Sequence, residues 1–108
     1  MMTWKIRYTD KARRDLRNIM EYVSYDLLEP ETAKNLLRRI MGEIETLDTM
    51  PLRYPLFHEE PWRGRGFRFF AVGNYLVFYA PEENSSMVYI VRVIYGGRGI
   101  QEQLRSEN

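Results

Sequence analysis

Hydrophobic and polar residues alternate with two different periods in the N-terminal half of the chain. Residues 3–8 alternate with a period of two, which is typical of a strand with one buried face. After Thr9 and Asp10, either of which can cap a helix, apolar residues recur every three or four positions. This first helical stripe consists of Ala12, Leu16, Ile19, Val23 and Leu27, with Lys11, Arg13, Arg14, Asp15 and Arg17 outside it.

A second helical stripe follows Pro30, which suits the first turn of a helix because its missing N–H costs nothing there. The apolar positions of this stripe are Ala33, Leu36, Leu37, Ile40, Ile44 and Leu47. Because the connection between the two stripes is short, we expect the two helices to pack antiparallel as a hairpin. Neither stripe can be covered by the partner helix alone, so a sheet must supply the rest of the core.

The C-terminal half predicts three strands. Residues 67–72 and 75–79 form a hairpin signal, since Gly73 and Asn74 between them both tolerate the positive φ of a tight turn. Residues 87–95 are apolar at most positions, which indicates a strand inside the sheet rather than at its edge. Strict alternation would place Val88, Ile90, Arg92 and Ile94 on one face and Tyr89, Val91, Val93 and Tyr95 on the other.

Two further stretches have no hydrophobic period. Residues 51–61 contain three prolines, which predicts an ordered surface loop that Tyr54, Leu56 and Phe57 hold to the core. Residues 99–108 are a polar tail that is either a short helix or disordered. The predicted fold is therefore α+β with the order β-α-α-β-β-β. A helical hairpin packs on one side of a mainly antiparallel four-stranded sheet, within a single domain spanning residues 1–108.

Composition narrows the class of protein. A chain of 108 residues that is 44% hydrophobic can build one core, and the absence of cysteine excludes disulfides, thiolate nucleophiles and cysteine-based metal sites. Neither a signal peptide nor the roughly 20 apolar residues of a membrane span is present, so we expect a cytoplasmic protein without a membrane partner. One histidine and scattered carboxylates argue against a metal site, and no dinucleotide or phosphate-loop motif predicts a cofactor.

Positive charge is concentrated between residues 62 and 80, where three arginines stand without any acidic residue. Arg63, Arg65 and Arg68 lie among glycines and aromatics, a combination that can bind phosphates and stack on bases. The alternative is that these charges only solvate a loop, or pair with Glu59 and Glu60. The segment is the first candidate for contacting a negatively charged ligand.

Three other residues are candidates for a site. Arg92 interrupts an apolar face and must find a carboxylate, a carbonyl or a ligand, with Glu59 or Glu60 as structural partners. Arg98 follows the double glycine that ends the last strand. His58 is the only histidine, and a general base of ordinary pKa would have to be this residue.

Several stretches in this order resemble the RelE/ParE superfamily of toxins from type II toxin–antitoxin systems. They are the helical hairpin with its proline, MPLRYPL, WRGRGFRFFAVGNYLVFY and VRVIYGGRG, and together they reach from about Trp4 to Gly99. The resemblance implies a small bacterial toxin of the plasmid-stabilisation type. Such a toxin stops growth when it is free, and a cognate antitoxin bound over its surface neutralises it.

The superfamily divides into RelE-like members, which cleave mRNA on the ribosome, and ParE-like members, which act on DNA gyrase. Arg98 matches an arginine of the ribonuclease site, and Arg68 matches a basic residue at the start of the first hairpin strand. At two further positions where the ribonuclease members carry a basic residue, this chain has Leu76 and Phe70. Their C-terminal tyrosine corresponds to about Leu104 in this chain. Tyr95 or His58 could replace the lost groups only if folding brings either one near Arg98.

The resemblance therefore favours a ParE-like toxin without a complete ribonuclease site, in which Arg68 and Arg98 are the candidate catalytic residues. Arg63, Arg65, Arg92 and Tyr95 are the candidate residues for binding a substrate or target. The expected partners are an antitoxin and either DNA gyrase or the ribosome with its mRNA. The alternatives are a ribosome-dependent endoribonuclease and a toxin-fold protein without toxicity.

Overall fold

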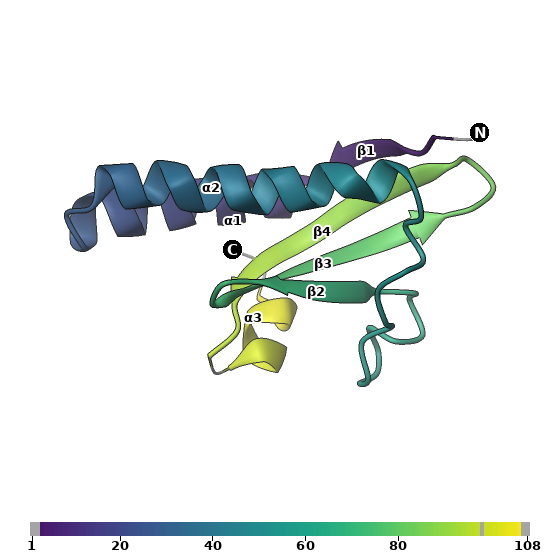
Figure 1. Cartoon of the computed structure of the whole chain (residues 1–108). Helices are drawn as coiled ribbons and strands as arrows, with labels where there is room; N and C mark the ends of the chain where they lie inside the picture. Colours follow the sequence, from purple (N-terminus) through teal and green to yellow (C-terminus); the bar gives the residue numbers. More distant parts are fainter. Residues whose placement is uncertain (1–2, 98, 107–108) are drawn as a thin grey trace.

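The computed structural model describes residues 3–97 and 99–106 and has the predicted α+β architecture (Figure 1). Its elements in chain order are β1 (Lys5–Tyr8), α1 (Asp10–Glu21), a π-helical turn (Tyr22–Asp26), α2 (Pro30–Glu45), a 3-10 turn (Thr46–Asp48), β2 (Arg68–Val72), β3 (Tyr75–Glu82), β4 (Met87–Tyr95) and α3 (Ile100–Arg105). In the described part of the chain, no helix is both long and apolar enough to cross a bilayer.

The four strands form one sheet in the order β1-β4-β3-β2. The β2–β3 and β3–β4 pairs are antiparallel, and β1 pairs with β4 in parallel at the edge of the sheet. The prediction that residues 87–95 form an inner strand is confirmed. The helices α1 and α2 lie along one face of the sheet, and α3 lies on the opposite side (Figure 1).

Both helices begin where the sequence predicts. The Thr9 hydroxyl caps α1 by accepting a 3.1 Å hydrogen bond from the amide of Ala12, and Pro30 opens α2. The end of the first stripe differs from the prediction, because Leu27 is 47% exposed. Its amide bonds the carbonyl of Tyr22 five residues earlier, and this wider π-turn rotates Leu27 away from the core.

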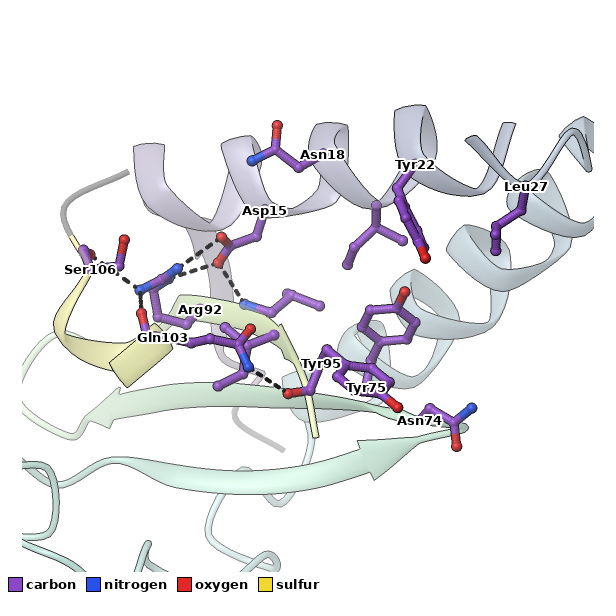
Figure 2. A pocket seen from close by; sticks show the side chains of 13 residues that line it. Asp15, Asn18, Tyr22, Leu27, Asn74, Tyr75, Arg92, Tyr95, Gln103 and Ser106 are labelled. Atoms are coloured by element: carbon purple, nitrogen blue, oxygen red, sulfur yellow. Dashed lines mark hydrogen bonds and ion pairs between the residues drawn. The ribbon is translucent and has the colours of Figure 1, made fainter. Parts of the chain in front are cut away.

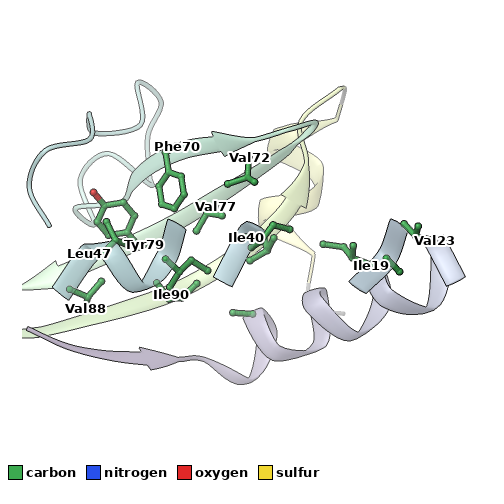
Figure 3. Close-up of a cluster of buried hydrophobic side chains, with 14 residues drawn as sticks. Ile19, Val23, Ile40, Leu47, Phe70, Val72, Val77, Tyr79, Val88 and Ile90 are labelled. Atoms are coloured by element: carbon green, nitrogen blue, oxygen red, sulfur yellow. The ribbon is translucent and has the colours of Figure 1, made fainter. Parts of the chain in front are cut away.

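The two faces of the sheet each cover a hydrophobic cluster. The cluster beneath the helical hairpin joins the helical stripes to β2, β3 and β4, with Ile40, Leu47, Val77 and Ile90 fully buried (Figure 3). The cluster on the other face contains Phe57, Trp62, Phe78, Ile94 and Leu104. Phe57 therefore holds the proline-rich loop to the core, as predicted, and the described part of the polar tail contains α3, which buries Leu104.

The prediction of strict alternation in β4 is wrong. Phe78 pairs with Arg92 while its neighbour Tyr79 pairs with Ile90, so β4 carries one extra residue at this point, a β-bulge. The bulge shifts the phase of the strand. Val93 consequently joins Ile90 in the cluster under the helices, and Ile94 joins the cluster on the other face.

The predicted turn at Gly73-Asn74 is confirmed by the pairing of Val72 with Tyr75. Gly73 has a φ of 59°, whereas Asn74 is not among the residues with positive φ. The turn therefore needs glycine only at its first position, as in a type II′ hairpin.

Candidate functional site

A buried ion pair joins α1 to β4. Arg92 Nε lies 2.8 Å from Asp15 Oδ2, Arg92 Nη2 lies 3.0 Å from Asp15 Oδ1, and the two side chains are 7% and 8% exposed. Asp15 Oδ2 also accepts a 2.9 Å hydrogen bond from the amide of Val93. Arg92 Nη1 donates to the carbonyl of Gln103 at 2.5 Å, at the end of α3. The guanidinium of Arg92 is thus satisfied within the protein.

This pair corrects two expectations from the sequence. The partner of Arg92 is Asp15 and not Glu59 or Glu60. Asp15 was assigned to the polar side of α1, yet it is 7% exposed. The reason is positional: α1 runs along the part of β4 beyond Ile90, where β1 has ended, and Asp15 satisfies the open strand edge that remains there.

Arg68 lies at the start of β2 and turns toward the loop that precedes the strand. Its Nη1 donates to the carbonyl of Tyr54 at 2.6 Å and to that of Leu52 at 3.2 Å. The strand register places Arg68 opposite Tyr79, and Tyr79 opposite Ile90. Because Tyr95 follows Ile90 by five residues, Arg68 and Tyr95 are separated by roughly 15 Å along the sheet.

Arg63 and Arg65 are exposed in the turns between the proline-rich loop and β2. Neither side chain has a hydrogen bond or ion pair with the described residues. The carboxylate of Glu60 instead accepts from the amide of Gly64 at 2.8 Å, and Glu59 accepts from Gln101 of α3. Of the two predicted carboxylate partners, neither pairs with these arginines.

His58 and Arg98 complete the predicted set. The side chain of His58 is 72% exposed, and its Nε2 lies 3.7 Å from Glu59 Oε2. Arg98 lies outside the described residues. Gly96, two residues earlier, donates from its amide to the carbonyl of Asn74 at 2.8 Å, which ties the end of β4 to the hairpin turn.

A cavity of about 780 Å³ lies between α1, its π-turn and the ends of β3 and β4 (Figure 2). Tyr22 from the helix side and Tyr75 from the sheet side point toward one another across it (Figure 2). Ile19 and Val93 line its apolar part, and the Asp15–Arg92 pair closes one end. Of the predicted residues, the structure brings Arg92 and Tyr95 together here, while Arg68 is elsewhere.

The tyrosines of this cavity interact with one another. Tyr75 and Tyr95 pack edge to face with ring centroids 6.0 Å apart. Burial raises the pKa of Tyr75 above its ordinary value, and the hydroxyls of Tyr22 and Tyr95 raise it further. The Tyr75 hydroxyl therefore stays protonated at neutral pH and can donate and accept hydrogen bonds.

The chemistry that the cavity supports is binding. It offers aromatic and aliphatic surface together with tyrosine hydroxyls and the amides of Asn18 and Asn74, while its one carboxylate is already paired with Arg92. Such a surface accepts an apolar side chain whose neighbours form hydrogen bonds at the rim. The sequence could not identify Tyr22 and Tyr75 as partners, because only the topology brings them together.

Comparisons with known proteins agree on one fold. A family model described as "ParE toxin of type II toxin-antitoxin system, parDE" matches residues 6–99. The chain is similar to a solved structure of the chromosomal ParDE toxin–antitoxin system of Pseudomonas aeruginosa, with a TM-score of 0.70 at 19% identity, covering 86% of this chain and 96% of that one. No curated protein sequence gives a significant match.

Two RelE-type structures are also similar. The toxin–antitoxin complex RelBE2 from Mycobacterium tuberculosis gives a TM-score of 0.59 at 23% identity, covering 87% of this chain and 99% of that one. The isolated RelE toxin of Escherichia coli gives 0.54 at 13% identity, covering 93% of this chain and 92% of that one. At these identities the structural likenesses establish the fold.

Proposed function

This chain belongs to the ParE toxin family of type II toxin–antitoxin systems, and on that premise we propose that it inhibits growth by acting on a protein target, DNA gyrase being the first candidate. In its resting state it is bound and neutralised by a cognate antitoxin, in a system of the plasmid-stabilisation type. The proposal has two parts, the mode of action and the place where the antitoxin binds.

The observation that carries the mode of action is the dispersal of the candidate arginines. Arg68 donates to two loop carbonyls, Arg92 is buried against Asp15, and Arg63 and Arg65 lie in an exposed turn. Cleavage of RNA by its own 2′-hydroxyl needs a proton acceptor and convergent positive charge around one phosphate. The described residues do not assemble such a set.

Two apolar side chains strengthen this argument. At the positions where a ribonuclease of this superfamily is expected to carry positive charge, the chain has Phe70, which is 6% exposed, and Leu76. Phe70 stacks on Tyr54 with ring centroids 4.6 Å apart, as part of the cluster under the helices. Position 70 is therefore part of the hydrophobic core. Losing a charge that stabilises the transition state typically lowers the rate by a factor of about 10² to 10³.

The cavity at Tyr22, Tyr75 and Tyr95 is the proposed antitoxin site. The similar chains from P. aeruginosa and M. tuberculosis come from a toxin–antitoxin system and a toxin–antitoxin complex, which supports an antitoxin partner for this chain. An amphipathic segment can insert an apolar side chain between Ile19 and Val93 and bind the tyrosine hydroxyls with its polar groups. Tyr95 is then a binding residue, in keeping with its prediction from the sequence.

The mode of action is tested with purified toxin in two parallel assays. Supercoiling by purified DNA gyrase should fall as toxin is added, while mRNA on translating ribosomes should stay intact. If supercoiling is unaffected at toxin concentrations far above those of gyrase, the gyrase target is wrong. If induced expression does not slow growth at all, the chain is a toxin-fold protein without toxicity.

The alternative, a ribosome-dependent endoribonuclease of the RelE type, is favoured by one observation. The exposed side chains of Arg63 and Arg65 have no partner in the described part of the chain and are available to phosphates. Under this alternative, Arg68→Ala combined with Arg98→Ala abolishes both mRNA cleavage and toxicity. Unchanged toxicity in a folded double variant dismisses it.

The antitoxin site is tested separately, by neutralisation. Tyr75→Ala combined with Tyr95→Ala should weaken binding of the cognate antitoxin by about tenfold or more, because truncated aromatic anchors lose both area and hydrogen bonds. Met41→Ala is the matched control, since Met41 is 41% exposed on α2 and does not line this cavity. Equal affinities for both variants would place the antitoxin elsewhere.

A further inference from the structure

The tip of the helical hairpin, residues 21–31, exposes a group of large apolar side chains. Tyr22 is 50% exposed, Tyr25 73%, Leu27 47% and Leu28 79%. The tip projects beyond the sheet (Figure 1). An apolar surface of this kind on a small protein commonly marks an interaction site.

The backbone of the tip is irregular where these side chains stand. α1 widens into the π-turn at Tyr22, and π-turns occur frequently at functional sites. Leu28 has a φ of 56°, a left-handed conformation that glycine and asparagine adopt more easily than leucine. The amide of Glu29 bonds the carbonyl of Val23 at 3.0 Å, six residues earlier, whereas the corresponding bond in the usual glycine-containing helix end spans five residues. Leucine is unfavourable at position 28 for two reasons: its backbone is left-handed, and its apolar side chain is exposed to water.

The charge of the tip determines which partner fits it. Between residues 21 and 33 there are four carboxylates and no lysine or arginine. The carboxylates are Glu21, Asp26, Glu29 and Glu31. Of these four carboxylates, only Glu31 forms an ion pair within the described part of the chain, with Lys34 at 3.5 Å in an exposed position. Such a surface repels the phosphates of RNA and DNA and attracts a positively charged protein surface.

We propose that the hairpin tip is the surface with which the toxin binds its target protein, and that the target presents an apolar site bordered by lysine or arginine. Tyr25 and Leu28 are the apolar anchors, and Asp26 and Glu29 supply the complementary charge. This inference rests on the proposed action on a protein target, and it adds to that action the surface and the partner chemistry.

The position of the tip also accounts for neutralisation. Tyr22 and Leu27 belong to the tip and at the same time line the cavity assigned to the antitoxin. An antitoxin segment seated in the cavity therefore covers one side of the tip. Target and antitoxin then compete for the same toxin molecule without binding identical residues. Tyr25 and Leu28 do not line the cavity, so they separate the two interactions experimentally.

Leu28→Asn is the central test variant, and Met50→Asn is its matched control. Met50 also has a left-handed backbone, with a φ of 57°, and is 72% exposed, but it lies beyond the opposite end of α2. Asparagine adopts the left-handed backbone conformation at lower cost than leucine or methionine. Both variants should therefore melt at or above the melting temperature of the wild type. A loss of activity in only one of them is then not a loss of folding.

The proteins to compare are the wild type, Leu28→Asn, Asp26→Lys with Glu29→Lys, and Met50→Asn. Growth arrest on induction, neutralisation by the co-expressed antitoxin and binding to purified DNA gyrase are measured for each. The two tip variants should need about tenfold more toxin for growth arrest or gyrase binding and remain neutralised. Met50→Asn should match the wild type.

Growth arrest by the tip variants at wild-type toxin levels overturns the inference. So does a loss of neutralisation with arrest retained, since the tip would then belong to the antitoxin. A wild-type dimer that the tip variants convert to monomers in sedimentation would assign the tip to self-association and overturn it too. If the wild type arrests growth but does not bind gyrase, the gyrase target fails, while tip variants that lose arrest still support the inference.

Discussion

Arg92 and Asp15 form a two-pronged ion pair in which both guanidinium–carboxylate contacts are 3.0 Å or shorter. The pair links three elements, because Asp15 belongs to α1, Arg92 to β4, and Nη1 of Arg92 donates to the carbonyl of Gln103 in α3. It also closes one end of the tyrosine-lined cavity. A residue predicted to bind a target thus has a structural role that positions the site.

Removing one member of this pair should be strongly destabilising. Asp15→Ala leaves the buried guanidinium of Arg92 without its carboxylate and the amide of Val93 without its acceptor, which we expect to cost about 3–5 kcal/mol of unfolding free energy. Urea denaturation measures the change. Asp10→Ala is the control, since Asp10 is exposed and its ion pair with Arg13, at 3.5 Å, is exposed as well. A loss for Asp15→Ala as small as that of the control would contradict the structural role.

Local sequence patterns predicted the fold, but they did not predict the ion pair between Asp15 and Arg92. Helix and strand periods depend on near neighbours, so they predicted the element order and most of both helical stripes. Asp15 lies three residues after Ala12 and four before Ile19, which is a core-facing position by spacing. Its charge led to the opposite assignment, although a carboxylate was one of the three partners that the sequence allowed for Arg92.

The cavity could not be predicted because its residues come from distant parts of the sequence. Tyr22 follows α1 directly, whereas Tyr75 and Tyr95 meet only because β3 and β4 pair in a particular register. The bulge that sets this register after Ile90 has no signal in the local sequence. The arginine-rich segment was visible at once, but where each guanidinium points depends on loop carbonyls such as that of Tyr54.

The pH dependence of stability in alkali should report on Tyr79. This side chain is fully buried, burial raises its pKa to about 12 against the opposing effect of Arg68, and its hydroxyl donates to the carbonyl of Pro51 at 2.6 Å. In the unfolded chain it ionises near its ordinary value of 10.0. Its contribution is therefore complete below pH 10 and is lost as the pH rises toward 12, by about 2–3 kcal/mol.

Tyr79→Phe separates this contribution from that of the other tyrosines. The variant should lose about 1 kcal/mol at neutral pH, because the Pro51 carbonyl loses its donor. Between pH 10 and 12 its stability should fall less steeply than that of the wild type. Urea denaturation at intervals of half a pH unit gives both curves, and parallel curves would show that folding does not raise the pKa of Tyr79.

Arg68 should affect stability more than toxicity. Arg68→Ala removes two hydrogen bonds from a charged donor to the carbonyls of Leu52 and Tyr54, and we expect a loss of about 1–3 kcal/mol. Arg65→Ala, at an exposed position, should change stability by no more than about 0.5 kcal/mol. Thermal unfolding and growth arrest are measured together. A folded Arg68→Ala protein without toxicity would instead favour the ribonuclease alternative.

Gly97 should control the position of Tyr95 at the cavity. A Cβ on Gly97 would lie 2.3 Å from Cε2 of the Tyr95 ring, so Gly97→Ala must displace that ring from its place against Tyr75. We expect about tenfold weaker binding of the antitoxin, measured by titration calorimetry, with growth arrest by the free toxin retained. Gly42→Ala is the control, since a Cβ there meets no atom within 4 Å and alanine in a helix should add about 0.5–1 kcal/mol of stability. Undiminished antitoxin affinity in Gly97→Ala would show that the antitoxin does not use the Tyr95 side of the cavity.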